Sequence, residues 1–171
     1  MKISLKLLIF VISIISLSCR VETDLYIIET PTLELKASGP FFKGSNTFTA
    51  NWEYSFDELF PDKDDKIIIE DARVTSIKIV PKKGVDYPNF GRVIMQMKTK
   101  NRNMSRIGLL NSNFKNDQSN SLKVWQIQDE FYKAFKNESI TFMADFEMLD
   151  DKYDDDLSFD LLVTFDVRTR K

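Results

Sequence analysis

Histidine is absent from this 171-residue sequence, and cysteine occurs only once, at Cys19. The missing histidine excludes Ser-His-Asp triads, Cys-His nucleophiles and histidine-ligated zinc sites within the chain, because each of these needs an imidazole. A single cysteine cannot form an internal disulfide. These absences remove the commonest catalytic sites, so we expect the protein to perform no catalysis.

An excess of basic residues is also missing. The formal net charge is −2, from 24 Lys and Arg against 26 Asp and Glu, which argues against nucleic acid as a partner because phosphate backbones attract positive surfaces. Five glycines and five prolines leave little material for long flexible linkers. The hydrophobic content of 43% and the 14 phenylalanines are typical of a globular domain with an aromatic core.

The longest apolar run is too short to cross a membrane. It covers residues 7–15 and is interrupted only by Ser13, whereas about 20 residues are needed to span the hydrocarbon. Lys2 and Lys6 precede the run and small residues follow it, which is the pattern of a secretory signal peptide. We predict that residues 1–18 form a signal peptide that is removed on export.

Cys19 stands where this signal would be cut, directly after Ser16-Leu17-Ser18. The arrangement resembles the lipobox of bacterial lipoproteins, although Ser16 replaces the leucine that is commonest at its position. The resemblance implies that Cys19 becomes the first residue, carries acyl chains such as palmitate, and serves as the lipidation site. It also implies a location in the bacterial cell envelope, at the outer membrane rather than the inner one; the alternative is a secreted, soluble protein.

The chain after the signal is expected to consist of a lipidated tether, residues 19–23, and a single domain, residues 24–171. This length is sufficient for one domain with its own hydrophobic core. The membrane is then a partner through the N-terminal lipid. Because the tether is so short, an anchored domain would lie close to the bilayer surface.

Alternating apolar and polar residues predict strands along most of the domain. The alternation is clearest in residues 140–148 and 157–167, which we predict to form an antiparallel hairpin with one buried face. A slip in the alternation between residues 67–70 and 73–80 predicts a bulge near Asp71.

Two short helices are expected between the strands. Ser55 and Glu58 have the spacing of a capping box at the start of the first, and the second covers residues 129–136. Eight or nine strands without long intervening helices predict an all-β fold. The preferred architecture is a mainly antiparallel β-sandwich with an Ig-like layout, and the alternative is a closed β-barrel.

The order of these elements also resembles a broad set of bacterial envelope lipoproteins without assigned activities. The segments that carry this likeness are Ser55–Phe60, Arg73–Val80 and Leu157–Val167. The resemblance implies a β-sandwich. It implies no particular activity and no functional residues.

An acidic loop joins the last two predicted strands and is a candidate metal site. Its carboxylates could supply oxygen ligands to Ca²⁺, the only cofactor that the sequence suggests, although the spacing differs from an EF-hand loop and no glycine provides its sharp turn. We therefore expect at most weak calcium binding by Asp150, Asp151, Asp154, Asp155 and Asp156.

Three further groups of residues were considered for function. Asp145 and Glu147 share a strand face at a spacing comparable to that of glycosidase acid pairs. A basic cluster comprises Lys98, Lys100, Arg102 and Arg106, and apolar residues on otherwise polar faces are Ile94, Met143 and Leu162. Each group also fits an ordinary solvent-exposed surface.

The function expected from the sequence is that of a lipid-anchored envelope protein that binds or scaffolds an envelope protein or polymer. One alternative is a carrier that holds a lipid or another apolar ligand between the sheets. The other is a hydrolase that works without histidine and uses carboxylates.

Overall fold

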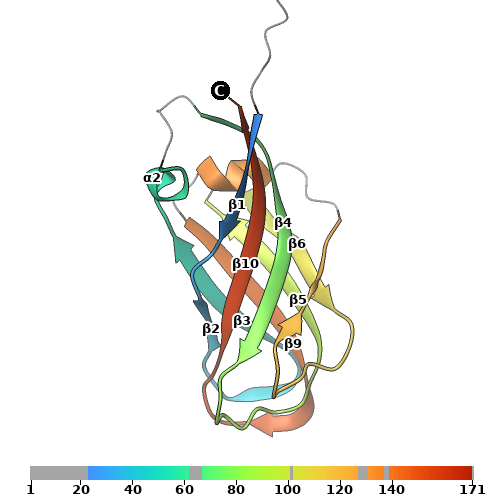
Figure 1. The fold of residues 1–171 in the computed structure, drawn as a ribbon. Helices are drawn as coiled ribbons and strands as arrows, with labels where there is room; N and C mark the ends of the chain where they lie inside the picture. The colour runs from blue at the N-terminus through green and yellow to red at the C-terminus, as the bar shows by residue number, and fades with distance from the viewer. Residues whose placement is uncertain (1–22, 62–66, 101, 127–130, 137–138, 171) are drawn as a thin grey trace, which may run out of the picture.

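The computed structural model describes residues 23–61, 67–100, 102–126, 131–136 and 139–170. The described part of the chain is mainly β-strand, and its strand pairs are antiparallel, which confirms the predicted all-β antiparallel fold (Figure 1). The elements in chain order are β1 (Thr23–Glu29), β2 (Leu33–Ala37), β3 (Phe41–Glu53), α2 (Phe56–Leu59), β4 (Ile68–Pro81), β5 (Phe90–Thr99), β6 (Arg102–Leu110), β7 (Asn120–Ser121), β8 (Lys123–Val124), η1 (Phe131–Lys136), β9 (Ser139–Tyr153) and β10 (Leu157–Arg170).

The ten strands belong to one sheet, which curls until it is nearly closed into a barrel. Of the two predicted architectures, this is closer to the barrel than to two separate sheets. β10 has β4 on one side and β1 and β2 on the other, and the sheet continues through β3, β9, β5 and β6. The predicted hairpin of residues 140–148 and 157–167 is therefore wrong: each strand buries its apolar face as expected, but β2 and β3 lie between β10 and β9 in the sheet. Thr30 lies between β1 and β2, and its backbone N–H donates to the Val163 carbonyl.

A short segment links the two remaining edges of the sheet. β7 pairs with β4, and β8 pairs with β6. Leu122 lies between β7 and β8, and its N–H donates to the Ile77 carbonyl at 3.0 Å. Trp125 follows β8, and its N–H donates to the Ile107 carbonyl at 2.8 Å. Residues 120–125, named here the closing segment, therefore satisfy backbone groups on both edges that would otherwise be open to other chains.

The inward face of the sheet is filled with aromatic rings. Phe146 and Phe159 stack with their centroids 4.8 Å apart, and Phe48, Phe90 and Phe114 pack around them at 4.8–6.4 Å. A second group lies nearer the chain termini and contains Trp52, Tyr54, Phe135 and Phe165. Among the described residues, these rings pack against one another on the inward face, where the carrier hypothesis placed an apolar ligand.

Local signals account for the non-strand elements. The capping box before α2 is present: the Glu58 N–H donates to Ser55 Oγ, and the Ser55 N–H donates to Glu58 Oε2. The second predicted helix is a 3₁₀-helix, η1, and residues 129–130 lie outside the described residues. It is held by the Tyr54 hydroxyl, which donates to the Ala134 carbonyl at 2.8 Å; burial raises the pKa of Tyr54.

The predicted irregularity near Asp71 is also confirmed. β4 is one continuous strand, and its register against β10 shifts between the pairs Asp71–Arg168 and Ile69–Thr169. Both ends of the described chain lie at the same end of the barrel, where Thr23 pairs with Arg170. In the described parts of the chain, no helix is both long enough and apolar enough to cross a membrane.

Candidate binding pocket

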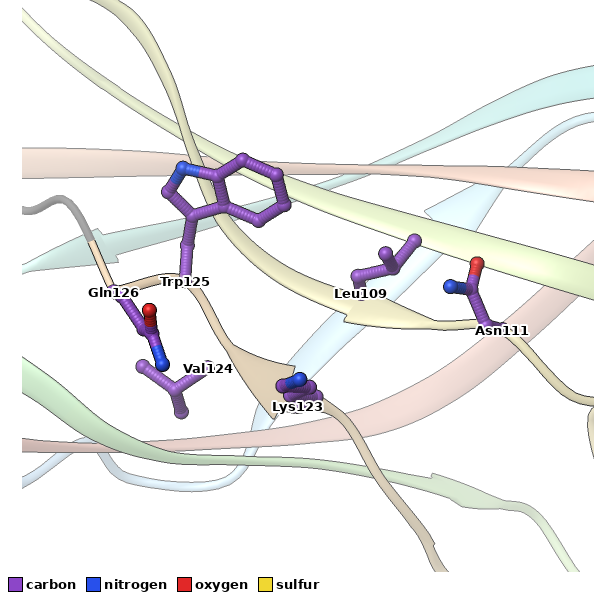
Figure 2. Close-up of a pocket in the computed structure, with 6 residues that line it drawn as sticks. All are labelled: Leu109, Asn111, Lys123, Val124, Trp125 and Gln126. Atoms are coloured by element: carbon purple, nitrogen blue, oxygen red, sulfur yellow. The ribbon is translucent and has the colours of Figure 1, made fainter.

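A pocket of about 250 Å³ lies beside the closing segment, where β6 meets β8 (Figure 2). Most of its exposed lining is apolar, with amide groups and one ammonium group at the margin. The lining residues are Leu109, Asn111, Lys123, Val124, Trp125 and Gln126. Half-buried apolar side chains around a concave surface are typical of ligand sites.

Strand pairing explains how these residues come together. Lys123 lies opposite Leu109, and Val124 lies opposite Gly108, so β8 places its side chains beside the end of β6. A Cβ built at Gly108 would lie 2.6 Å from Ile77 Cδ1. The glycine at this position therefore lets the β6 backbone approach β4 closely at the point where the sheet nearly closes.

Two cations border the pocket. Arg106 Cζ lies 5.1 Å from the centroid of the Trp125 ring, a cation–π distance, and Lys123 contributes directly to the lining. The site therefore combines an indole and aliphatic groups with positive charge. This combination favours a ligand that has an apolar body and an anionic group.

The sequence analysis identified parts of this region but not the pocket. Arg106 belongs to the predicted basic cluster, and Ile94 lies directly opposite Leu109 on the neighbouring strand. Met143 pairs with Gln96, whereas Leu162 lies opposite Lys78 on another part of the barrel. Trp125 was missed because residues 122–127 show only a weak strand pattern, and their position depends on pairing with two distant strands.

The acidic loop does not gather its carboxylates. Asp150 accepts hydrogen bonds from the backbone and the side chain of Asn89, and these bonds lower the pKa of Asp150. Asp151 forms an ion pair with Lys43, and Asp154 forms one with Lys152. Asp156 accepts a hydrogen bond from the Gly39 N–H. Among the residues that the structure describes, no three acidic side chains, including Asp155, come close enough to hold a metal ion. These separate partners give the acidic residues a structural role in holding the end of β9 and the following turn.

Asp145 and Glu147 lie on the outer face of β9, as predicted, but each has its own partner. The Thr47 hydroxyl donates to Asp145 Oδ1 at 2.6 Å, and Arg92 Nε lies 3.9 Å from Glu147 Oε2. Neither carboxylate lines the Trp125 pocket. The geometry therefore offers no support for the carboxylate hydrolase.

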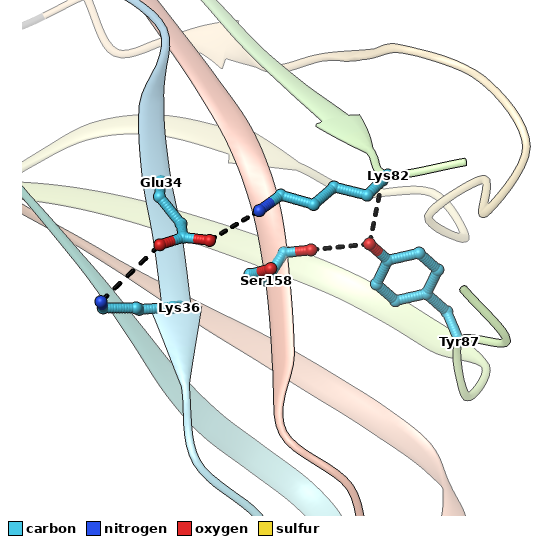
Figure 3. A network of polar contacts seen from close by, with 5 residues as sticks. All are labelled: Glu34, Lys36, Lys82, Tyr87 and Ser158. Carbon is cyan, nitrogen blue, oxygen red and sulfur yellow. Dashed lines mark hydrogen bonds and ion pairs between the residues drawn. The ribbon is translucent and has the colours of Figure 1, made fainter. Parts of the chain in front are cut away.

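A separate polar network lies across β2, β4 and β10 (Figure 3). Lys82 Nζ lies 2.6 Å from Glu34 Oε1. The backbone N–H of Lys82 donates to the Tyr87 hydroxyl, and the Tyr87 hydroxyl donates to the Ser158 carbonyl. The hydrogen bond from Lys82 lowers the pKa of Glu34 and raises that of Lys82, while burial raises the pKa of Tyr87. The contacts fasten the loop between β4 and β5 to the sheet.

The remaining predicted site, Cys19, lies outside the described residues, so its lipidation stays a prediction. Comparison of the chain with protein-family models, with curated proteins and with solved structures finds no match.

Proposed function

We propose that this protein is exported, anchored by a lipid on Cys19 in the bacterial cell envelope, and that its barrel binds an envelope protein or polymer. The Trp125 pocket carries the binding part of the proposal. It is the place where an exposed apolar surface, an aromatic ring and positive charge meet on the outside of the molecule. The ligand group that it fits is an apolar moiety with a nearby carboxylate, sulfate or phosphate.

Two observations support binding rather than catalysis or internal transport. Six of the seven candidate acids have separate partners: Asp145, Glu147, Asp150, Asp151, Asp154 and Asp156. The interior that a carrier would need is filled by rings such as Phe146 and Phe159. An outer pocket on a rigid barrel therefore fits a module that recognises a partner while the lipid keeps it at the membrane.

The anchor is tested by expressing the full chain in bacteria supplied with labelled palmitate. We expect the wild type to carry the label and to partition with membranes, and the Cys19→Ser variant to lose both properties, because stable attachment depends on buried acyl chains. An unlabelled wild-type protein would refute the anchor.

The pocket is tested with anilinonaphthalene sulfonate, a fluorescent probe with an apolar body and one anionic group, and with its uncharged relative N-phenyl-naphthylamine. We expect Trp125→Ala to raise the dissociation constant of both probes by roughly tenfold, the loss of about 1.4 kcal/mol of contact energy. Lys123→Gln should weaken binding of the sulfonate alone.

Leu162→Ala is the matched control for probe binding, because Leu162 is an exposed apolar residue on β10 that does not line the pocket. Its affinity for both probes should equal that of the wild type. Equal binding by the wild type and Trp125→Ala would refute the assignment of the pocket without affecting the anchor.

A further inference from the structure

We propose that the corner of the barrel around β1 docks directly on the lipid bilayer and inserts apolar side chains at the interface. This corner, named here the docking corner, comprises Leu25, Ile27, Phe56 and Ile68. The inference rests on the proposed lipid anchor and extends it, because it assigns the anchored domain a defined orientation. The predicted occupant of the surface is the headgroup–acyl boundary of a bilayer.

The four side chains are unusually exposed for large hydrophobic residues. The exposed fractions are 61% for Leu25, 69% for Ile27 and 51% for Ile68, and Phe56 is 38% exposed. On β1 the apolar residues Tyr26 and Ile28 face inward, so Leu25 and Ile27 form a second apolar face that lies outside the core of the described residues. A cluster of this kind marks a surface that contacts another apolar phase.

Strand register places three of the four in neighbouring rows. One row crosses β1, β10 and β4 and contains Thr23, Arg170 and Ile68. Further along β1, Leu25 lies opposite Arg168 and Ile27 lies opposite Asp166. The row positions also bring Arg168 and Arg170 beside the apolar residues; Arg170 Nε lies 3.2 Å from Glu70 Oε1. Arginine side chains beside an inserted apolar residue can form ion pairs with the phosphate groups of the lipid headgroups.

Ring contacts join Phe56 to the same corner. Phe56 lies 4.8 Å from Phe60, centroid to centroid, and Phe60 lies 5.2 Å from Tyr26 in an edge-to-face arrangement. Phe56 is thereby linked through Phe60 to Tyr26 of β1, the neighbour of Leu25 and Ile27 in the chain.

The length of chain before Thr23 selects a bilayer over a second copy of the protein. Thr23 is the fourth residue after Cys19, so the start of β1 lies within about 14 Å of the lipidated residue even when the chain is fully extended. Interfacial segments bury their apolar face about 5–10 Å into the boundary of the headgroups. The anchor therefore delivers this corner, and not the opposite end of the barrel, to the membrane.

The test couples the chain from Cys19 onward, which contains every described strand and helix, to phosphatidylcholine vesicles through its only thiol and a maleimide lipid. Single tryptophans are introduced by Leu25→Trp and Ile27→Trp. Their fluorescence, after subtraction of the wild-type signal from Trp52 and Trp125, is measured with ordinary lipid and with lipid brominated on the acyl chains. We expect blue-shifted emission and strong quenching by bromine at both positions.

The control is Phe42→Trp, because Phe42 is 57% exposed but pairs with Lys152 at the opposite end of the barrel. Its emission should be the same in both kinds of vesicle. Unquenched emission from the two β1 variants, or equal quenching of all three, would overturn the docked orientation. A blue shift without bromine quenching would indicate contact between copies and would also overturn it. Chemical coupling makes these results independent of whether Cys19 is acylated in cells.

Discussion

At the scale of single residues, two charged side chains fasten the loop between β4 and β5. Lys82 joins this loop to Glu34 on β2, and Asp150 near the end of β9 accepts hydrogen bonds from Asn89. Both carboxylates have lowered pKa values because hydrogen-bond donors stabilise their charged forms. Such contacts contribute stability only while the carboxylates are ionised.

Glu34 should therefore give a pH-dependent contribution to stability. Because its pKa is lower in the folded state than in the unfolded state, the contribution is fully present at about pH 6–7 and is lost as the pH falls below about 4. We expect Glu34→Gln to have a lower Tm than the wild type at neutral pH, and the difference to disappear near pH 3.

Calorimetry across this pH range checks the expectation, with Glu147→Gln as the matched control. Glu147 is a similarly exposed carboxylate on the outer face, but its nearest cation, Arg92, is 3.9 Å away. A Tm difference for Glu34→Gln that is the same at pH 3 and pH 7 would contradict the assignment of the stabilising contact to the charged form.

At the scale of elements, β10 shows how a two-residue period becomes a core. Its residues Leu157, Phe159, Leu161, Val163, Phe165 and Val167 are all buried, as their alternation predicted. Phe159 alone contacts the rings of five neighbours: Phe48, Tyr87, Phe90, Phe114 and Phe146. Through this one side chain, β10 packs against β3, β9 and the loops that carry Tyr87 and Phe114.

Phe159→Ala should destabilise the protein by about 3–5 kcal/mol, because the substitution removes buried apolar surface and leaves a cavity among rings that cannot collapse freely. Urea denaturation followed by tryptophan fluorescence measures the loss. Phe42→Ala makes the same chemical change at an exposed position of β3 and should cost less than about 0.5 kcal/mol. Similar losses for the two variants would contradict the central role of Phe159.

The elements differ in how well local sequence predicts them. The buried faces of β9 and β10, the α2 capping box and the bulge near Asp71 were predicted because each leaves a signal within a few residues. The predicted pairing of β9 with β10 was wrong, because the choice of partner strand leaves no local signal: β9 pairs with β3 and β5, and β10 pairs with β1, β2 and β4. The closing segment was not, because its two short strands, β7 and β8, are defined by partners on β4 and β6 rather than by their own periodicity.

At the scale of the whole molecule, near-closure of the sheet depends on the conformation of the loop before β7. Asn120 is buried; its side chain accepts from the Lys115 N–H and donates to the carbonyls of Lys115 and Gln118. These contacts shape the loop so that the next residues reach both edges of the sheet. The Trp125 pocket lies on this closure and depends on it.

Asn120→Ala should loosen the closure and cost about 1–3 kcal/mol, because backbone groups buried in the loop lose their partners. Hydrogen exchange is the direct measurement: the amides of Leu122 and Trp125, which bond to β4 and β6, should exchange faster. Amides in the β3–β9 ladder should keep their protection.

Asn46→Ala is the control for this effect. The Asn46 side chain also bonds to nearby backbone, at Phe42 and Gly44, but it lies in an exposed stretch of β3. It should leave the exchange of Leu122 and Trp125 unchanged. Unaltered exchange of these two amides in Asn120→Ala would show that the closure does not depend on the loop.

The sequence by itself determined which residues face inward, where the short capped helix begins, and the absence of histidine chemistry. It also contains the predicted export signal and Cys19. These are local properties, because strand alternation, capping and signal patterns depend on neighbouring residues. Tertiary structure alone decided that one sheet nearly closes and that Trp125 and Leu109 line the same pocket. It also decided that Asp150, Asp151, Asp154 and Asp156 take separate partners, and that β9 and β10 pair with other strands. Each of these depends on pairing between residues far apart in the chain, and the local alternation of apolar and polar residues does not indicate which strands pair.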